Sequence, residues 1–182
     1  MIKKGIILAG GTGTRLSPLT KAVNKQLLPI YDKPLIFYPL SILMLANIKN
    51  ILMIVNPGQI ENFKSLLGDG KRFGIKIQYK IQKKPKGLAD AFILGKNFIK
   101  KDNVALILGD NFFYGQSLTD KLEKSLTHTV GSRIFLKNVK TPENFGVAKI
   151  INNKIKKIIE KPKKFISNYA ITGLYFFDNK VI

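Results

Sequence analysis

The sequence contains no cysteine and one histidine, and only three of its 31 basic residues are arginine. Without cysteine the chain forms no disulfide and performs no thiol chemistry, which suits a reducing compartment. The histidine, His128, lies outside every motif described below, so we expect a solvated loop residue rather than a catalytic base. Any catalysis by this chain therefore relies on other side chains.

Long hydrophobic runs are also missing. The longest apolar stretch, residues 35–48, is interrupted by polar residues and a proline and falls short of a membrane span. The few apolar residues before Gly10 are too short for a signal peptide. We therefore expect a cytoplasmic protein without membrane association. Its 182 residues, 45% of them hydrophobic, suffice for one domain with a sizeable core.

Acidic residues are scarce, with 11 against 31 basic ones, which gives a formal net charge of +20. Such a charge raises the possibility of nucleic-acid binding, in which counterion release supplies much of the affinity. The excess is almost all lysine, however, and it is scattered along the chain together with many isoleucines and asparagines. We expect no specific nucleic-acid binding, and instead a surface that attracts anionic sugar phosphates and nucleotides.

A glycine-rich loop follows a short apolar run at Ile6–Leu8, which has the pattern of a buried parallel strand. Bare backbone N–H groups, two hydroxyls and a guanidinium fork in such a loop can hold phosphate oxygens. The residues that offer them are Gly10, Gly11, Thr12, Gly13, Thr14 and Arg15. No Lys-Ser or Lys-Thr follows the last glycine, which excludes a P-loop, and Leu16 replaces the third glycine of the dinucleotide motif.

Further strands and helices alternate after this loop. Apolar runs predict strands at 50–56, 76–82 and 103–108 and helices at 35–46 and 61–67, the first of them buried around most of its circumference. Two more strands are expected at 133–139 and 168–177, and a short amphipathic helix within 115–126. This order predicts an α/β fold, a Rossmann-like and mostly parallel sheet flanked by helices, with ligands at the carboxyl ends of the strands.

Two such strand ends have polar residues with useful chemistry. The amide of Gln82 can pair with the donor and acceptor edge of a nucleobase, and Gly87 lets backbone approach the ring, although a plain surface turn fits the spacing equally well. Asp110 offers a hard oxygen ligand that can hold Mg²⁺ against triphosphate oxygens, whereas many aspartates after strands only cap a turn.

The order of motifs resembles the sugar nucleotidyltransferase family, in particular its members that transfer a thymidylyl group to glucose 1-phosphate. The resemblance runs from Lys4 to Ile182. It includes Gly-Gly-x-Gly-Thr-Arg-Leu at 10–16, Lys-Gln-Leu-Leu-Pro at 25–29, Leu-Gly-Asp-Asn at 108–111 and Glu-Lys-Pro at 160–162. It implies the nucleotide-diphospho-sugar transferase fold and a Mg²⁺-dependent reaction of dTTP with α-D-glucose 1-phosphate that gives dTDP-glucose and pyrophosphate, a step of dTDP-rhamnose biosynthesis.

The resemblance also assigns roles to residues. Arg15 and Lys25 would stabilise the leaving pyrophosphate, Asp110 would hold the metal, and Lys161 would place the sugar phosphate. Implied nucleotide contacts are Leu8, Gly10, Gly11, Thr12, Gly13, Thr14, Arg15, Lys25, Gln26, Gln82, Gly87 and Asp110. Implied sugar contacts are Asn111, Phe145, Gly146, Glu160, Lys161 and Ile171. On this basis residues 1–110 form the nucleotide-binding part and 111–182 the sugar-binding part.

Some positions depart from the family pattern. Phe145 stands where tyrosine is usual, and Lys86 and Asp90 replace the expected small or acidic residue and glutamine, both in peripheral places. The family continues beyond the point matched by Ile182, with a second metal aspartate and much of a homo-oligomer interface, so we expect a truncated form. Three alternatives stay open: a related enzyme for UTP or another sugar 1-phosphate, an inactive nucleotide-sugar-binding protein, and a basic nucleic-acid binder.

Overall fold

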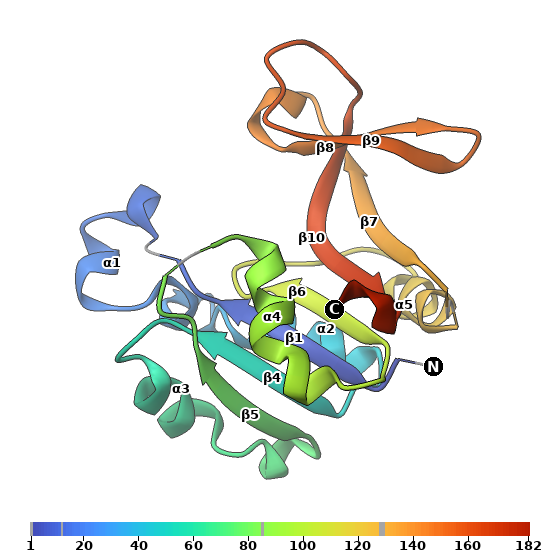
Figure 1. Ribbon diagram of the computed structural model, residues 1–182. Coiled ribbons are helices and arrows are strands. Elements are labelled where there is room, and N and C mark those ends of the chain that lie inside the picture. Colours follow the sequence, from blue (N-terminus) through green and yellow to red (C-terminus); the bar gives the residue numbers. More distant parts are fainter. Residues whose placement is uncertain (1, 12, 85, 128–129) are drawn as a thin grey trace. The chain divides into compact units, whose positions relative to one another are not determined.

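A computed structural model describes residues 2–11, 13–84, 86–127 and 130–182 (Figure 1). The chain divides into two compact units. The first comprises the residues up to Arg133 together with Phe176–Ile182, and the second comprises Ile134–Tyr175. In the described parts of the chain, no helix is long and apolar enough to cross a membrane.

A parallel sheet organises the first unit. Its strands, in the order β5-β4-β1-β6, are β5 (Lys76–Ile81), β4 (Asn50–Val55), β1 (Lys4–Ala9) and β6 (Val104–Leu108). β1 is hydrogen-bonded in parallel to β4 on one side and to β6 on the other, with Lys4 opposite both Asn50 and Val104. The register therefore brings the carboxyl ends of these strands level. The predicted strands and the parallel sheet are confirmed.

Helices cover both faces of this sheet. The main ones are α2 (Phe37–Leu45), α3 (Ile60–Leu67) and α4 (Leu88–Ile99). A Cβ added at Gly5 would lie 2.7 Å from Leu43 of α2, whereas one added at Gly95 of α4 would lie 2.9 Å from Ile6. Because successive residues of a strand point to opposite faces, α2 and α4 lie on opposite sides of β1.

Helix α2 differs from the prediction in its burial. The sequence predicted a helix enclosed around most of its circumference, with its methionine in the core. Ile42 and Leu43 are buried, but Met44 is 36% and Leu45 is 49% exposed. Only one side of α2 thus packs against the sheet, and the other side, which includes Met44 and Leu45, is exposed.

Shorter elements connect this framework. They are η1 (Thr14–Leu16), α1 (Leu19–Ala22), η2 (Lys25–Leu27), β2 (Pro29–Ile30), β3 (Lys33–Pro34), η3 (Lys71–Phe73), α5 (Leu118–Leu126) and η5 (Asn179–Val181). β2 and β3 form a small antiparallel pair. The predicted amphipathic helix within 115–126 corresponds to α5.

The second unit is antiparallel. It contains η4 (Pro142–Asn144), β8 (Gly146–Ile151) and β9 (Lys154–Glu160), together with most of β7 (Ser132–Asn138) and β10 (Tyr169–Phe177). β8 and β9 form a hairpin whose two turn residues, Asn152 and Asn153, both have positive φ angles, as tight hairpin turns require. β10 pairs with β8 and with β7. The hairpin lines up Gly146 with Glu160.

Gly109 tests how closely β6 and β1 approach at their carboxyl ends. A Cβ at this position would lie 3.0 Å from both the Cα of Ala9 and the carbonyl oxygen of Leu8, which are backbone atoms that cannot rotate away. We expect Gly109→Ala to lower the free energy of unfolding by about 1–3 kcal/mol, measured by chemical denaturation.

Gly115→Ala is the control for this substitution, because a Cβ at Gly115 meets nothing within 4 Å. Equal stability of the two variants would contradict the close approach of the strands.

Candidate functional site

The glycine-rich loop follows β1 directly and is held from two directions. Gly13 has a φ of 62°, in the left-handed region that favours glycine, and the Thr20 hydroxyl donates a hydrogen bond of 2.9 Å to its carbonyl oxygen. Thr14 and Arg15 follow in η1 with exposed side chains. Thr12, a predicted phosphate contact, lies outside the described residues.

Asn56, at the carboxyl end of β4, fixes the other side of the loop. Its Oδ1 accepts a hydrogen bond of 3.2 Å from the N–H of Gly11, and its Nδ2 donates one of 2.8 Å to the carbonyl oxygen of Gly11. These two hydrogen bonds hold the backbone of Gly11 in place. Sequence reasoning missed this residue, because nothing in the sequence indicates which loop its amide meets.

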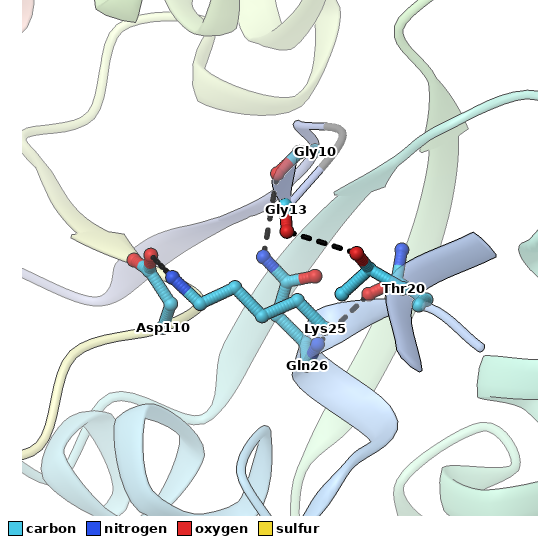
Figure 2. A network of polar contacts seen from close by, with 7 residues as sticks. Gly10, Gly13, Thr20, Lys25, Gln26 and Asp110 are labelled. Carbon is cyan, nitrogen blue, oxygen red and sulfur yellow. Dashed lines mark hydrogen bonds and ion pairs between the residues drawn. The ribbon is translucent and has the colours of Figure 1, made fainter. Parts of the chain in front are cut away.

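Lys25 and Asp110 form an ion pair, with 2.6 Å between Nζ and Oδ2 (Figure 2). Lys25 comes from η2, and Asp110 comes two residues after β6. Their side chains are 30% and 34% exposed. Two residues predicted to act on the same triphosphate are thus in direct contact, although 85 positions separate them in the sequence. In this arrangement each charge neutralises the other.

Gln26 is buried beside this pair with one unsatisfied atom. Its side chain is 3% exposed, and Nε2 donates to the carbonyl oxygen of Gly10 at 3.3 Å (Figure 2). Its Oε1 is buried and has no hydrogen-bond partner among the described residues. A buried acceptor without a donor costs about 1–3 kcal/mol. The described residues do not offset this cost.

Gln82 lies at the end of β5 and is 3% exposed. Its Nε2 donates a hydrogen bond of 2.8 Å to Oδ2 of Asp90, in the first turn of α4. A Cβ added at Gly10 would lie 2.8 Å from Gln82 Oε1, so the glycine loop passes close to this amide. Asp90, which we expected in a peripheral place, thus contacts Gln82, a predicted base-recognition residue.

A cavity of about 290 Å³ opens next to the loop. It is lined by Gly11, Thr20, Lys21, Ala22, Val23, Asn24, Lys25, Asn56, Pro57 and Gln59. Two lysines and several amide groups face this space, which suits an anionic and polar ligand. Gly87, the N-cap residue of α4, is exposed, and Leu8 is half-buried near the end of β1.

Metal ligands are few. Asp110 follows β6 as predicted, and Asn111 comes next with its backbone N–H donating to Leu108. Within residues 2–11, 13–84, 86–127 and 130–182, no group of three or more His, Cys, Asp or Glu side chains could hold a metal ion. A divalent cation at this place would therefore be bound by Asp110 together with oxygen atoms of a bound ligand.

The second unit brings together most of the predicted sugar contacts. A Cβ added at Gly146 would lie 2.7 Å from Glu160 Oε2 and 3.8 Å from Ile171. The backbone N–H of Lys161 donates to the carbonyl oxygen of Phe145 at 3.0 Å. The start of β8, the end of β9 and β10 thus place these residues around the space beside Gly146.

Tyr175 adds an electrostatic observation in this unit. Burial raises the pKa of Tyr175 above the ordinary value of a tyrosine, and the negative charge of Glu160 raises it further. The Glu160 carboxylate therefore acts on the interior of the second unit as well as facing Gly146.

Comparison with known proteins identifies the family of this chain. The nucleotidyl transferase family profile matches residues 4–182. The chain is 56% identical over 180 residues to a glucose-1-phosphate thymidylyltransferase of Neisseria meningitidis, covering 98% of this chain and 62% of the relative. For the enzyme of that name from Xanthomonas campestris, identity is 52% over 179 residues, covering 98% and 61%. The chain thus spans about 62% of the length of these curated relatives.

Solved structures show the same fold. A Bacillus anthracis structure, assigned as a glucose-1-phosphate thymidylyltransferase and containing sucrose, has a TM-score of 0.90 at 42% identity, covering 97% of this chain and 72% of that one. A UDP-glucose pyrophosphorylase complexed with UDP-glucose has a TM-score of 0.82 at 26% identity, covering 99% and 77%. The predicted α/β fold, with a parallel core flanked by helices, is confirmed.

The link between Glu160 and Tyr175 can be measured. We expect Glu160→Gln to lower the pKa of Tyr175, because a repulsive charge is removed, while burial keeps the pKa above the usual tyrosine value. The pKa is followed by NMR titration of ring-labelled tyrosine, with Tyr175→Phe identifying the resonance. Glu143→Gln, an exposed site of the same unit, serves as control. Equal shifts in both variants would show that Glu160 does not face Tyr175.

Proposed function

The chain belongs to the nucleotidyl transferase family, and from this premise we propose that it takes part in transferring a thymidylyl group from dTTP to α-D-glucose 1-phosphate, giving dTDP-glucose and pyrophosphate. The observation that favours a nucleotide at this place is the group formed by the Lys25–Asp110 ion pair and the unsatisfied buried Oε1 of Gln26, next to the glycine loop. The thymidylyl and glucosyl specificity is supported by the identity of 56% to the Neisseria meningitidis relative.

In the proposed reaction, an oxygen of the sugar phosphate attacks the α-phosphorus of dTTP in line, and pyrophosphate leaves. Both reactants are anions, so the protein has to hold them together and offset their charge, and no nucleophilic side chain is needed. Lys25 would turn from Asp110 to the triphosphate, while the exposed Arg15 and the loop N–H groups would bind the phosphates on the other side. A hydroxyl of the nucleotide would satisfy Gln26.

A divalent cation fits the oxygen chemistry of this site. Mg²⁺ usually takes one or two carboxylates and fills its shell with water and phosphate oxygens, which matches a site with Asp110 as its carboxylate. We propose Mg²⁺ held by Asp110 and the triphosphate, where it would neutralise charge on the phosphates. Departure of Lys25 towards the nucleotide would free the carboxylate for this ion, so the two changes would support each other.

On the sugar side, we propose that Glu160 accepts hydrogen bonds from hydroxyl groups and that Lys161 neutralises the sugar phosphate. Gly146 leaves space beside Glu160 that any side chain would fill. Phe145, Ile171 and Asn111 complete the proposed set. The division into a nucleotide-binding part, 1–110, and a sugar-binding part, 111–182, the cytoplasmic location and the homo-oligomeric state stay predictions.

A second candidate function is the binding of a nucleotide without turnover, which the cavity beside the glycine-rich loop would also support. The two functions separate by experiment: turnover gives pyrophosphate release, whereas binding alone gives saturable dTTP titration without release. Competition between dTTP and UTP tests the related enzymes for other bases. Steeply salt-dependent association with DNA or RNA would instead favour the nucleic-acid alternative.

Pyrophosphate release with Mg²⁺, dTTP and glucose 1-phosphate tests the proposed reaction. We expect Asp110→Asn to lower the rate by more than about tenfold, since a neutral amide is a weaker metal ligand. Asp120→Asn, at an exposed position of α5, is the control and should keep the rate. Equal rates in all three proteins would contradict the role of Asp110. If the unaltered chain shows neither pyrophosphate release nor dTTP binding, the proposal is overturned.

Arg15 gives an independent prediction. Its side chain is exposed, so Arg15→Ala should change the free energy of unfolding by less than about 0.5 kcal/mol. If the Arg15 side chain binds the triphosphate, Arg15→Ala also lowers turnover, by roughly a hundredfold. Thermal unfolding and pyrophosphate release measure the two effects. Normal turnover in a normally folded variant would show that the loop does not use Arg15.

A further inference from the structure

The hydrogen bond between Gln82 and Asp90 has a consequence for which base the chain accepts. Gln82 Nε2 donates to Asp90 Oδ2 at 2.8 Å, and the Gln82 side chain is only 3% exposed. Asp90 is half-buried in the first turn of α4, eight positions further along the chain. The contact is therefore a shielded one between two successive elements of the first unit.

A glutamine amide can present its two ends in either order. Rotation by half a turn exchanges a double donor for an acceptor at almost no change in shape, so the surroundings decide the orientation. An ionised carboxylate only accepts hydrogen bonds. With Asp90 as neighbour, the orientation that directs Nε2 to Oδ2 gains a hydrogen bond, whereas the flipped one sets two oxygens against each other.

The orientation that directs Nε2 to Asp90 also determines where Oε1 of Gln82 lies. Oε1 lies on the side of the glycine loop, 2.8 Å from the position that a Cβ of Gly10 would take. The acceptor of Gln82 and its second Nε2 proton are thus set in a defined order at the end of β5, beside the loop that follows β1. This arrangement is fixed before any ligand arrives.

We propose, on the basis of the nucleotide site inferred above, that Asp90 is a positioning residue for base selection, which locks Gln82 so that it accepts thymine or uracil and rejects cytosine. Thymine and uracil carry an N3–H donor beside an O4 acceptor, which match an amide that presents Oε1 and an N–H in that order. Cytosine has an acceptor at N3 and a donor at its 4-amino group, and needs the flipped amide. Because the flip breaks the bond to Asp90, cytosine binding is penalised.

A purely structural role of Asp90 makes a different prediction. An acidic residue in the first turn of a helix is also stabilised by the helix dipole, whatever Gln82 does. Asp120 occupies the same part of α5, where it is exposed. Asp120→Asn therefore removes the same charge from a corresponding position and is the matched control for Asp90→Asn.

The test compares calorimetric binding of dUTP and dCTP in the presence of Mg²⁺, since these two nucleotides share the sugar and lack the methyl group. We expect Asp90→Asn to lower the preference for dUTP over dCTP by roughly tenfold, because an asparagine supports both amide orientations. Asp120→Asn should keep the preference. In the free protein, NMR resonances of the Gln82 side-chain amide should shift in Asp90→Asn and stay in place in Asp120→Asn.

Each outcome has a distinct meaning. An unchanged preference in Asp90→Asn, or an equal loss of affinity for both nucleotides, would overturn the inference and leave the proposed function intact. The same holds if the unaltered chain binds dUTP and dCTP equally. If dTTP, dUTP and dCTP all fail to bind, the proposed function is wrong and the inference falls with it, whereas the amide resonances still report whether Asp90 orients Gln82.

Discussion

The parallel pairing of β1 between β4 and β6 is the constraint on which the candidate nucleotide site depends. Lys4 lies opposite Asn50 on one side and Val104 on the other, so the three strands reach their carboxyl ends at the same level. The loop after β1, Asn56 after β4 and Asp110 after β6 are thereby brought to one edge. A shift of one register step would reverse the side-chain faces of a strand and separate these groups. Burial of the strand interiors thus also fixes the chemistry at their ends.

This edge is not arranged for greatest stability. Gln26 buries an acceptor without a donor, and Lys25 and Asp110 are only partly shielded, where an ion pair contributes little. A leucine or methionine in place of these groups would pack without such costs. Groups that are unfavourable in the free chain but gain a partner from a bound ligand are typical of binding sites. Asn56, in contrast, uses both ends of its side-chain amide to bind the N–H and the carbonyl oxygen of Gly11, so these polar groups are satisfied and the loop is held in place.

How much could be predicted from the sequence differs between the two units. The strands of the first unit are short apolar runs with glycine-rich or polar ends. Their positions could be predicted from the sequence, because strands that are buried on both faces consist of such runs. The hairpin of β8 and β9 was missed, since β9 is rich in lysine and exposed, and its pairing is set by the turn at Asn152 rather than by hydrophobicity. Helix α4 was not delimited either. Contacts such as Lys25–Asp110 and Gln82–Asp90 depend on the tertiary fold. The sequence could therefore indicate single candidate residues, but not which residue each of them contacts.

The high positive charge of the chain makes the Lys25–Asp110 ion pair unusual. With 31 basic and 11 acidic residues, most lysines have no carboxylate to pair with. Of the five ion pairs among the described residues, three join positions at most three apart, and such pairs form whatever the fold. Lys25–Asp110 spans the sheet edge and has the least exposed carboxylate of the five. In so basic a protein, a scarce carboxylate at this edge is consistent with our proposal that Asp110 holds Lys25 in place until an anionic ligand takes the position of the carboxylate. The net positive charge of the chain would favour the arrival of such a ligand.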